Sequence, residues 1–220
     1  RERLPELRPA SARHDGRYAI PTFEDILRLL AEENAKRKRQ AGDHAPAGKE
    51  GSEVGVYPEL KHPGYFEALG LALEPRVVAL LEAHGYRSRE AKAILQSFEA
   101  QSLRKLARLT ELRLVQLLAR EPFDLAEIAT YAQGIGVAKA LLIRRRADGP
   151  LGEPTGLVPE AHARGLFVHA WTFRAENAFL PPDFRSAGGR GAHGDLPAEI
   201  ARYRALGVDG FFTDHPAAAR

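Results

Sequence analysis

The feature that most constrains the fold is an alternation of short apolar runs with longer amphipathic stretches, which starts at residue 54. The apolar runs are rich in β-branched and aromatic residues, and the stretches between them have helical periodicity. Parallel strands joined by helices give this pattern, so we predict an α/β protein with a parallel sheet. The predicted strands are 54–61, 92–98, 112–119, 165–173 and 208–214. The predicted helices are 73–85, 99–110, 158–165, 196–207 and a stretch, 124–134, that begins helical.

The residues before this alternation have a different character. Residues 1–21 are polar and read as a loop, 21–40 as an amphipathic helix, and 41–53 as a mobile surface loop. A sixth strand could lie in 134–143, although the sequence does not place it securely. Five or six strands are too few for a closed eight-stranded barrel, and an open doubly wound sheet fits the count equally well. No strand end, however, carries a glycine-rich nucleotide-binding fingerprint.

Composition excludes several classes of site. The net charge of +3 over 220 residues is too small to argue for a nucleic-acid partner. The chain has no cysteine, which excludes disulfides and thiolate metal sites, and no apolar run approaches the ~20 residues needed to cross a bilayer. The eight histidines form no His-x-His or His-Glu-x-x-His pattern, and there is no Gly-x-Ser-x-Gly elbow. These features leave the cellular compartment undetermined.

Polar residues at the ends of the first two predicted strands are candidates for chemistry, because the carboxyl ends of parallel strands form the functional rim of α/β folds. Period-two alternation places Glu59 and Lys61 on one face, and likewise Gln96 and Phe98. Burying an ion pair is costly, so we expect Glu59 and Lys61 to form either an inert salt bridge or a site where a ligand or metal compensates their burial. Gln96 is either a hydrogen-bonded core residue or a substrate contact.

The later strands add two further candidates. Phe167, His169, Trp171 and Phe173 are predicted to share one face of 165–173. Trp171, the only tryptophan, is either a core residue or an aromatic wall of a site. Asp214 ends the last predicted strand.

Several strings in fixed order give the chain a family resemblance: "GVYPELKHPGYF", "LQSFE", "VQLL", "YAQGIGVAK", "GLFVHAWTFRAENAFLPPDF" and "GVDGFFTDHP". Together with "RERLPELRPA…DGRYAIPTFEDIL", they resemble the glycerophosphodiester phosphodiesterase family, and most closely its bacterial glycerol-metabolism type. The resemblance covers nearly the whole chain. It implies a TIM (β/α)8 barrel and metal-dependent hydrolysis of glycerophosphodiesters to glycerol 3-phosphate and an alcohol.

The resemblance also implies roles for individual residues. Glu59 matches the glutamate of the family's Glu-x-Lys motif, a ligand to a divalent ion, Ca²⁺ or Mg²⁺, and Lys61 matches the lysine that lies near the metal carboxylates and the phosphate. A hard cation with oxygen ligands suits an anionic phosphodiester, because it neutralises charge that develops on the non-bridging oxygens. The remaining matches are Gln96 and Phe98 beneath the substrate, Trp171 as a wall of the glycerol pocket, and Asp214 in a structural or rim position.

Other motifs of the family are absent from these 220 residues. Its general acid and base are histidines, one of them in a His-Arg motif, and two further metal carboxylates form a Glu-x-Asp motif. All are expected upstream of Arg1, and the sequence contains no such strings. We therefore expect residues 1–220 to be the C-terminal two-thirds of one barrel domain, with strands 1–3 missing and little or no activity alone.

Two other interpretations remain open. An incomplete barrel would have exposed strand edges, so a homo-oligomer or a non-catalytic binding or association remnant is the main alternative. A lyase-type phospholipase with the same barrel fits the "HAWTFRAENAF" stretch and the glycine-rich loop 186–194 less well.

Overall fold

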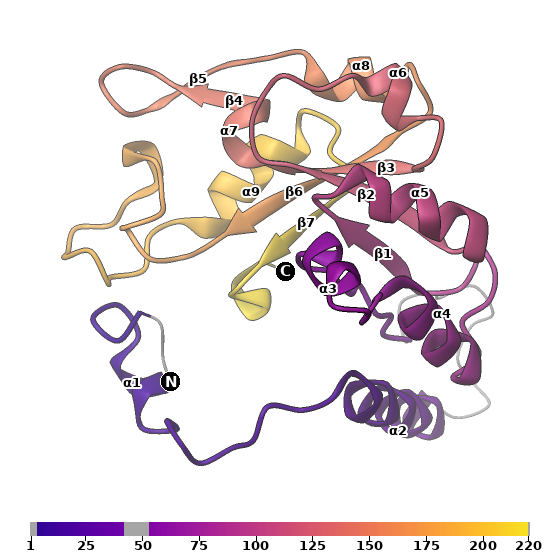
Figure 1. Ribbon diagram of the computed structural model, residues 1–220. Helices are drawn as coiled ribbons and strands as arrows, with labels where there is room; N and C mark the ends of the chain where they lie inside the picture. Colours follow the sequence, from indigo (N-terminus) through magenta and orange to yellow (C-terminus); the bar gives the residue numbers. More distant parts are fainter. Residues whose placement is uncertain (1–3, 42–52, 220) are drawn as a thin grey trace. The chain divides into compact units, whose positions relative to one another are not determined.

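A computed structural model describes residues 4–41 and 53–219 of the chain (Figure 1). It divides the chain into two compact units, residues 19–114 and residues 4–18 with 115–219, and each unit is described by itself. Most of the predicted mobile loop 41–53 lies outside the described residues. Among the described residues, no helix combines the length and the apolar character that a membrane span requires.

In the described part of the unit of residues 19–114 there are four helices and one complete strand. The elements are α2 (Phe23–Ala41), α3 (Pro63–Ala68), α4 (Glu74–Ala83), β1 (Ile94–Ser97) and α5 (Ala100–Leu109). Four of them, α2, α4, β1 and α5, confirm the sequence predictions within one or two residues at each end, and α3 was not anticipated. The core of the unit includes residues of α4, β1 and α5 that are fully buried, among them Leu81, Leu95, Leu103 and Leu106.

The predicted strand 54–61 does not form a regular strand. It pairs with the β1 segment only through two isolated parallel bridges, Val56↔Ala93 and Glu59↔Gln96. Pro58, between these bridges, has no amide hydrogen to donate, although its carbonyl oxygen accepts from the Gln96 amide at 3.1 Å. The segment is therefore extended and in register with β1 without a continuous ladder.

The other unit is built on parallel strands. β2 (Arg113–Leu118), which crosses the unit boundary, is followed in the sheet by β3 (Gly134–Ala138), β6 (Phe167–Phe173) and β7 (Gly210–Thr213) (Figure 1). β3 pairs with β2 from Val115↔Gly134 and with β6 from Gly134↔Phe167. The sixth strand, which the sequence could not place securely within 134–143, is thus β3, a central strand of this sheet.

Glycine explains why β3 is hard to recognise from sequence. A Cβ atom on Gly134 would lie 2.4 Å from the ring of Phe167, and one on Gly136 would lie 2.6 Å from the Leu117 side chain. Because glycine has no side chain, side chains of the neighbouring strands can pack directly against the β3 backbone. Glycine also lowers the β-propensity of the segment. Burial of β3 therefore rests on its other residues, such as Ile135, which is fully buried.

Short helices and one hairpin complete this unit. The helices are α1 (Pro9–Ala12), α6 (Leu125–Ile128), α7 (Lys139–Leu142), α8 (Leu157–His162) and α9 (Leu196–Arg204), with 3-10 turns η1 (Pro182–Phe184) and η2 (Pro216–Ala219). The hairpin of β4 (Ile143–Arg145) and β5 (Leu151–Pro154), absent from the sequence predictions, projects from the unit in Figure 1. Asp124 and Asp195 begin α6 and α9 by accepting hydrogen bonds from backbone amides of the first turn.

The predicted alternation of side chains between the two faces of β6 breaks down near the carboxyl end of the strand. Pairing with β7 is regular at Ala170 and becomes irregular before Phe173. Phe173 is fully buried and packs edge-on against Tyr203 of α9, with ring centroids 5.1 Å apart. The prediction that Phe173 continues the face of Trp171 is therefore wrong, because the irregularity shifts the period of the last residues.

A buried ion pair joins the start of α7, directly after β3, to α9. The Lys139 ammonium lies 2.6 Å from the carboxylate of Glu199, and 4.8 Å from the centroid of the Phe173 ring. Glu199 is fully buried, and its second carboxylate oxygen has no hydrogen-bond partner among the described residues. Burial lowers the pKa of Lys139 and raises the pKa of Glu199, because it disfavours both charged forms.

Two leucines of α5 test whether the helix packs as described. Leu106→Ala removes a fully buried side chain and is expected to lower the free energy of unfolding by about 2–5 kcal/mol. Leu109→Ala makes the same change where the side chain is 46% exposed, and is expected to cost under about 1 kcal/mol. Urea unfolding of both variants measures the difference. Equal losses would contradict the placement of α5.

The Lys139–Glu199 pair makes a second stability prediction. Lys139→Met alone leaves the Glu199 carboxylate buried without its counter-ion, and is expected to cost about 3 kcal/mol of the free energy of unfolding. Glu199→Leu alone is expected to cost a similar amount by isolating the ammonium. The double variant should recover most of the loss, because neither charge is then buried alone. A double-mutant cycle from urea unfolding at pH 7 measures the coupling, and additive losses would contradict a direct buried pair.

Candidate functional site

In the unit of residues 19–114, the structure places Glu59 directly opposite Gln96. The Gln96 backbone accepts from the Leu60 amide at 2.9 Å and donates to the Pro58 carbonyl at 3.1 Å, which fixes this register. Residues paired in this way have side chains on the same face of a sheet. The Gln96 side-chain oxygen is buried and has no hydrogen-bond partner among the described residues. A carboxylate and an unsatisfied amide oxygen are thus brought to one face.

Glu59 and Lys61 are close, but they are not a buried pair. The Lys61 ammonium lies 3.6 Å from a Glu59 carboxylate oxygen, and the side chains are 71% and 24% exposed respectively. The expectation that both residues are buried is therefore wrong for Lys61. The chain turns after Leu60, with His62 in the left-handed region at φ 50° before α3 begins, and this turn leaves Lys61 on the surface. Solvent makes such an ion pair weak, so the pair alone contributes little to stability.

The two segments are tied together just beyond these residues. The Ser97 hydroxyl donates to the Leu60 carbonyl at 2.9 Å, and the Glu99 carboxylate accepts from the Gly64 amide at 3.0 Å. Phe98, between these contacts, has a side chain that is about half exposed. The structure therefore brings Glu59 and Gln96 together, with Lys61 and Phe98 in the exposed turns that follow each segment.

Trp171 and Asp214 belong to the other unit. Trp171 lies at the carboxyl end of β6, partly buried, paired with Ala138 of β3 and with its indole 3.8 Å from the position a Cβ atom of Gly136 would take. The glycine thus leaves room beside the ring.

Asp214 follows β7 and accepts hydrogen bonds from Arg8 and Arg174, each at 2.8 Å. Partial burial works against ionisation, but the two guanidinium groups prevail and hold the pKa of Asp214 below its usual value. The Asp214 carboxylate is therefore committed to two arginines.

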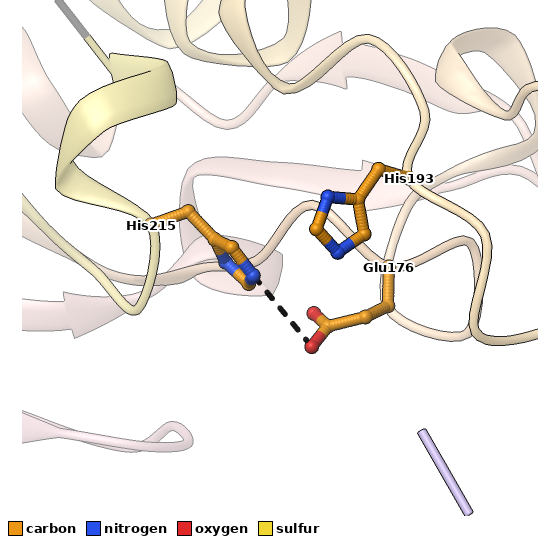
Figure 2. Close-up of side chains that lie close together, drawn as sticks. All are labelled: Glu176, His193 and His215. Atoms are coloured by element: carbon orange, nitrogen blue, oxygen red, sulfur yellow. Dashed lines mark ion pairs between the residues drawn. The ribbon is translucent and has the colours of Figure 1, made fainter. Parts of the chain in front are cut away.

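The same unit contains a cluster that the sequence analysis did not identify: Glu176, His193 and His215 (Figure 2). One potential ligand atom from each side chain lies within 4.8 Å of the others. In sequence the three residues are widely spaced and lie in or beside predicted loops, so no metal-binding spacing signals them. We call this group the Glu176 cluster.

Backbone pairing holds two members of the Glu176 cluster face to face. Glu176 and His193 are opposite each other in an isolated antiparallel bridge. On either side of the bridge, the Asn177 amide donates to Ala192 and the Gly194 amide donates to Ala175, both at 2.8 Å. Directly opposed residues in antiparallel pairs have Cβ atoms about 4.5–5.5 Å apart, so the side chains project together.

The carboxylate of Glu176 is fully buried, and its two oxygens differ in their hydrogen bonding. Its Oε1 accepts from the Arg8 guanidinium at 2.5 Å and lies 3.7 Å from Nε2 of His215. Its Oε2 has no hydrogen-bond partner among the described residues. Burial is the largest single influence and opposes ionisation, but the hydrogen bond and charge of Arg8, together with a backbone hydrogen bond, outweigh it and lower the pKa of Glu176. Burial also lowers the pKa of His215, whose Nδ1 accepts from the Ala175 amide at 3.3 Å.

Comparison with known proteins identifies relatives that match about nine-tenths of the chain. The sequence profile of the glycerophosphoryl diester phosphodiesterase family matches residues 2–218. A glycerophosphodiester phosphodiesterase of Arabidopsis thaliana, GDPD6, is 28% identical over 91% of this chain and 55% of its own length. A glycerophosphodiester phosphodiesterase of Haemophilus influenzae is 25% identical over 90% of this chain and 57% of its own length. The chain therefore spans a little over half the length of these relatives.

Solved structures support the fold. One from Silicibacter pomeroyi, named a glycerophosphoryl diester phosphodiesterase, aligns with a TM-score of 0.55 at 22% identity, over 90% of this chain and 54% of that one. A glycerophosphodiester phosphodiesterase from Parabacteroides distasonis aligns with a TM-score of 0.52 at 15% identity, over 90% and 61%. The α/β fold class is confirmed, and the absence of barrel strands 1–3 stays a prediction.

The profile match extends over nearly every residue, and it includes the strings on which the sequence resemblance was based. The predicted relationship is confirmed: this chain belongs to the glycerophosphoryl diester phosphodiesterase family.

Proposed function

We propose that the chain is part of a metal-dependent glycerophosphodiester phosphodiesterase, which hydrolyses its substrate to glycerol 3-phosphate and an alcohol. The observation that carries the proposal is the backbone pairing of Glu59 with Gln96, whose buried side-chain oxygen has no hydrogen-bond partner within residues 4–41 and 53–219. An unsatisfied buried oxygen costs free energy unless a ligand or water satisfies it. A cation or a substrate hydroxyl beside Glu59 would supply the missing partner.

The donor atoms suit Ca²⁺ or Mg²⁺. Both are hard cations that prefer carboxylate, amide and water oxygens, which is the chemistry that Glu59 and Gln96 offer. When bound, such an ion neutralises negative charge that develops on the phosphoryl oxygens. Six to eight ligands are usual for Ca²⁺, so Glu59 provides only part of the coordination and the family's Glu-x-Asp carboxylates would provide more.

We assign the remaining residues by their chemistry and by the family resemblance. Lys61 is exposed and only loosely paired, so its ammonium can reach an anionic phosphate with little loss of existing contacts. Phe98 and Trp171 offer apolar surface to the carbon skeleton of the substrate. Asp214 is engaged by two arginines and has a structural role at the rim.

We assign proton transfer to residues of the family's barrel that are not among the 220 of this sequence. Hydrolysis needs a base to activate the nucleophile and an acid to protonate the leaving alcohol. The His-Arg and Glu-x-Asp motifs that carry this chemistry in the family do not occur in this sequence. We therefore propose that residues 1–220 form the C-terminal two-thirds of the barrel domain. This part contributes substrate binding and one metal ligand.

Binding of glycerol 3-phosphate tests the role of Glu59. In millimolar Ca²⁺, the chain is expected to bind this ligand weakly, and Glu59→Gln should weaken binding at least tenfold because a neutral amide holds the cation poorly. Lys61→Met should also weaken binding through loss of the charge opposite the phosphate. Isothermal titration calorimetry, with and without EDTA, measures both effects.

Glu67→Gln is the matched control, because Glu67 is an exposed glutamate of the same unit that pairs with Lys105. It should leave binding unchanged. Binding that survives EDTA and the Glu59→Gln substitution would argue against the metal role and would favour a non-catalytic binding remnant.

A turnover assay tests the assignment of the acid and base. The chain alone is expected to release no choline from glycerophosphocholine above background with Ca²⁺ or Mg²⁺. The same residues preceded by a family segment with His-Arg and Glu-x-Asp motifs should be active, and Glu59→Gln should then lower kcat/KM by about 100-fold or more. Turnover by the chain alone, abolished by substituting one of its own histidines, would overturn the assignment.

A further inference from the structure

We propose that the Glu176 cluster is a site for Zn²⁺ or a similar divalent transition metal, separate from the oxygen-ligand site proposed at Glu59. Glu176, His193 and His215 would supply one carboxylate oxygen and two imidazole nitrogens. This inference stands on its own residues and does not depend on the proposed phosphodiesterase activity.

The distances are compatible with coordination after small side-chain movements. The three potential ligand atoms lie within 4.8 Å of one another. Zinc–nitrogen and zinc–oxygen bonds are about 2.0–2.2 Å, which in a tetrahedral site places ligand atoms about 3.3–3.5 Å apart. Rotation of the side chains can close that difference without moving the backbone, since His193 and His215 are not fully buried.

The backbone beneath the cluster is fixed before any ion binds. The bridge between Glu176 and His193 is continued by a network in which the Asn177 side chain donates to the carbonyl oxygens of Ser186 and Gly189. Gly194 lies so close to its neighbours that a Cβ atom there would be 2.2 Å from the Phe184 carbonyl oxygen. A site on such a support loses little conformational entropy when it binds a ligand.

The unpartnered oxygen of Glu176 is the second observation that points to a ligand. Glu176 is fully buried, and its Oε2 has no hydrogen-bond partner among the described residues. Figure 2 shows the carboxylate beside the two imidazole rings, with the dashed line joining its other oxygen, Oε1, to His215. A buried carboxylate that lies close to two imidazoles and has one oxygen without a partner is a suitable position for a cation.

Arg8 supports the carboxylate from outside the cluster. It donates to Oε1 of Glu176 at 2.5 Å and leaves Oε2 for the ion. Carboxylates that bind metals commonly accept hydrogen bonds on their other oxygen, which fixes their orientation. The guanidinium charge also repels a cation, so the affinity should be moderate.

The nature of the donors selects the ion. Two imidazoles and one carboxylate suit Zn²⁺, Co²⁺ and related ions, whereas Ca²⁺ and Mg²⁺ prefer oxygen ligands alone. Nδ1 of His215 accepts from the Ala175 amide at 3.3 Å, so a neutral ring in this arrangement carries its proton on Nε2. Coordination through Nε2 would transfer that proton to Nδ1 and break this long hydrogen bond. Water would occupy a fourth position on the ion.

Cobalt spectroscopy and zinc competition test the proposal. Titration of the wild-type chain with Co²⁺ is expected to give the intense visible absorption of a four-coordinate ion at one equivalent, and added Zn²⁺ should abolish it. Excess Mg²⁺ should not. His193→Asn and His215→Asn, which keep a polar side chain of moderate size, should each weaken Zn²⁺ binding at least tenfold.

His84→Asn is the control, because it removes a partly exposed histidine from the other unit and should leave binding unchanged. Thermal unfolding of each variant without metal checks that the fold is intact. Wild-type protein that binds no Co²⁺ or Zn²⁺ at concentrations up to about 1 mM would overturn the proposal. So would binding that is equal in the wild type and in both cluster variants.

Discussion

The close approach of strands across β3 is the constraint on which the 115–219 unit depends. Because Gly134 and Gly136 have no side chains, Phe167 and Leu117 can occupy space on either side of this strand. The price of this packing is a central strand with weak β-propensity, held by its neighbours and by buried residues such as Ile135. The carboxyl ends of β3 and β6 are thereby set side by side, which positions Trp171.

The polar groups beyond these strand ends are organised by arginine. Arg8 donates to both Glu176 and Asp214, and Arg174 donates to Asp214 as well. A guanidinium group is rigid and has donors in a fixed plane, so one arginine can orient two carboxylates at once. The segment that contains α1 is thus attached to the loops after β6 and β7. Both arginines contact the same oxygen of Asp214, Oδ2, whereas Oε2 of Glu176 has no hydrogen-bond partner in the described part of the chain.

Local sequence patterns were enough to predict most long elements, but not those that depend on tertiary contacts. The leucines of α5 and the apolar runs of β2 and β6 have periods that identify them directly. The β4–β5 hairpin was missed because its strands are short, charged and interrupted by proline and glycine. The sequence predicted a regular strand over 54–61, whereas the structure has only two isolated bridges there, because Pro58 cannot donate a hydrogen bond between them.

The candidate site was predictable where strand register decides it. The sequence placed Glu59 and Gln96 at the carboxyl ends of two predicted strands, and the structure pairs these residues in register, so that they share a face. The exposure of Lys61 depends on the left-handed turn at His62, which has no clear signal in the sequence. The Glu176 cluster depends on loop pairing and on the space left by Gly194. Such contacts join residues far apart in the chain and follow no period.

The two proposed metal sites differ in their donor atoms, so each would select a different kind of ion. Glu59 and Gln96 offer only oxygen atoms, which hold hard cations but discriminate weakly against others. The imidazoles of His193 and His215 add nitrogen donors, and nitrogen donors raise the affinity for transition metals far more than for Ca²⁺ or Mg²⁺. Millimolar Mg²⁺ could therefore occupy the oxygen site while trace Zn²⁺ occupies the Glu176 cluster. Ligand chemistry alone is sufficient for this separation, whatever the distance between the sites.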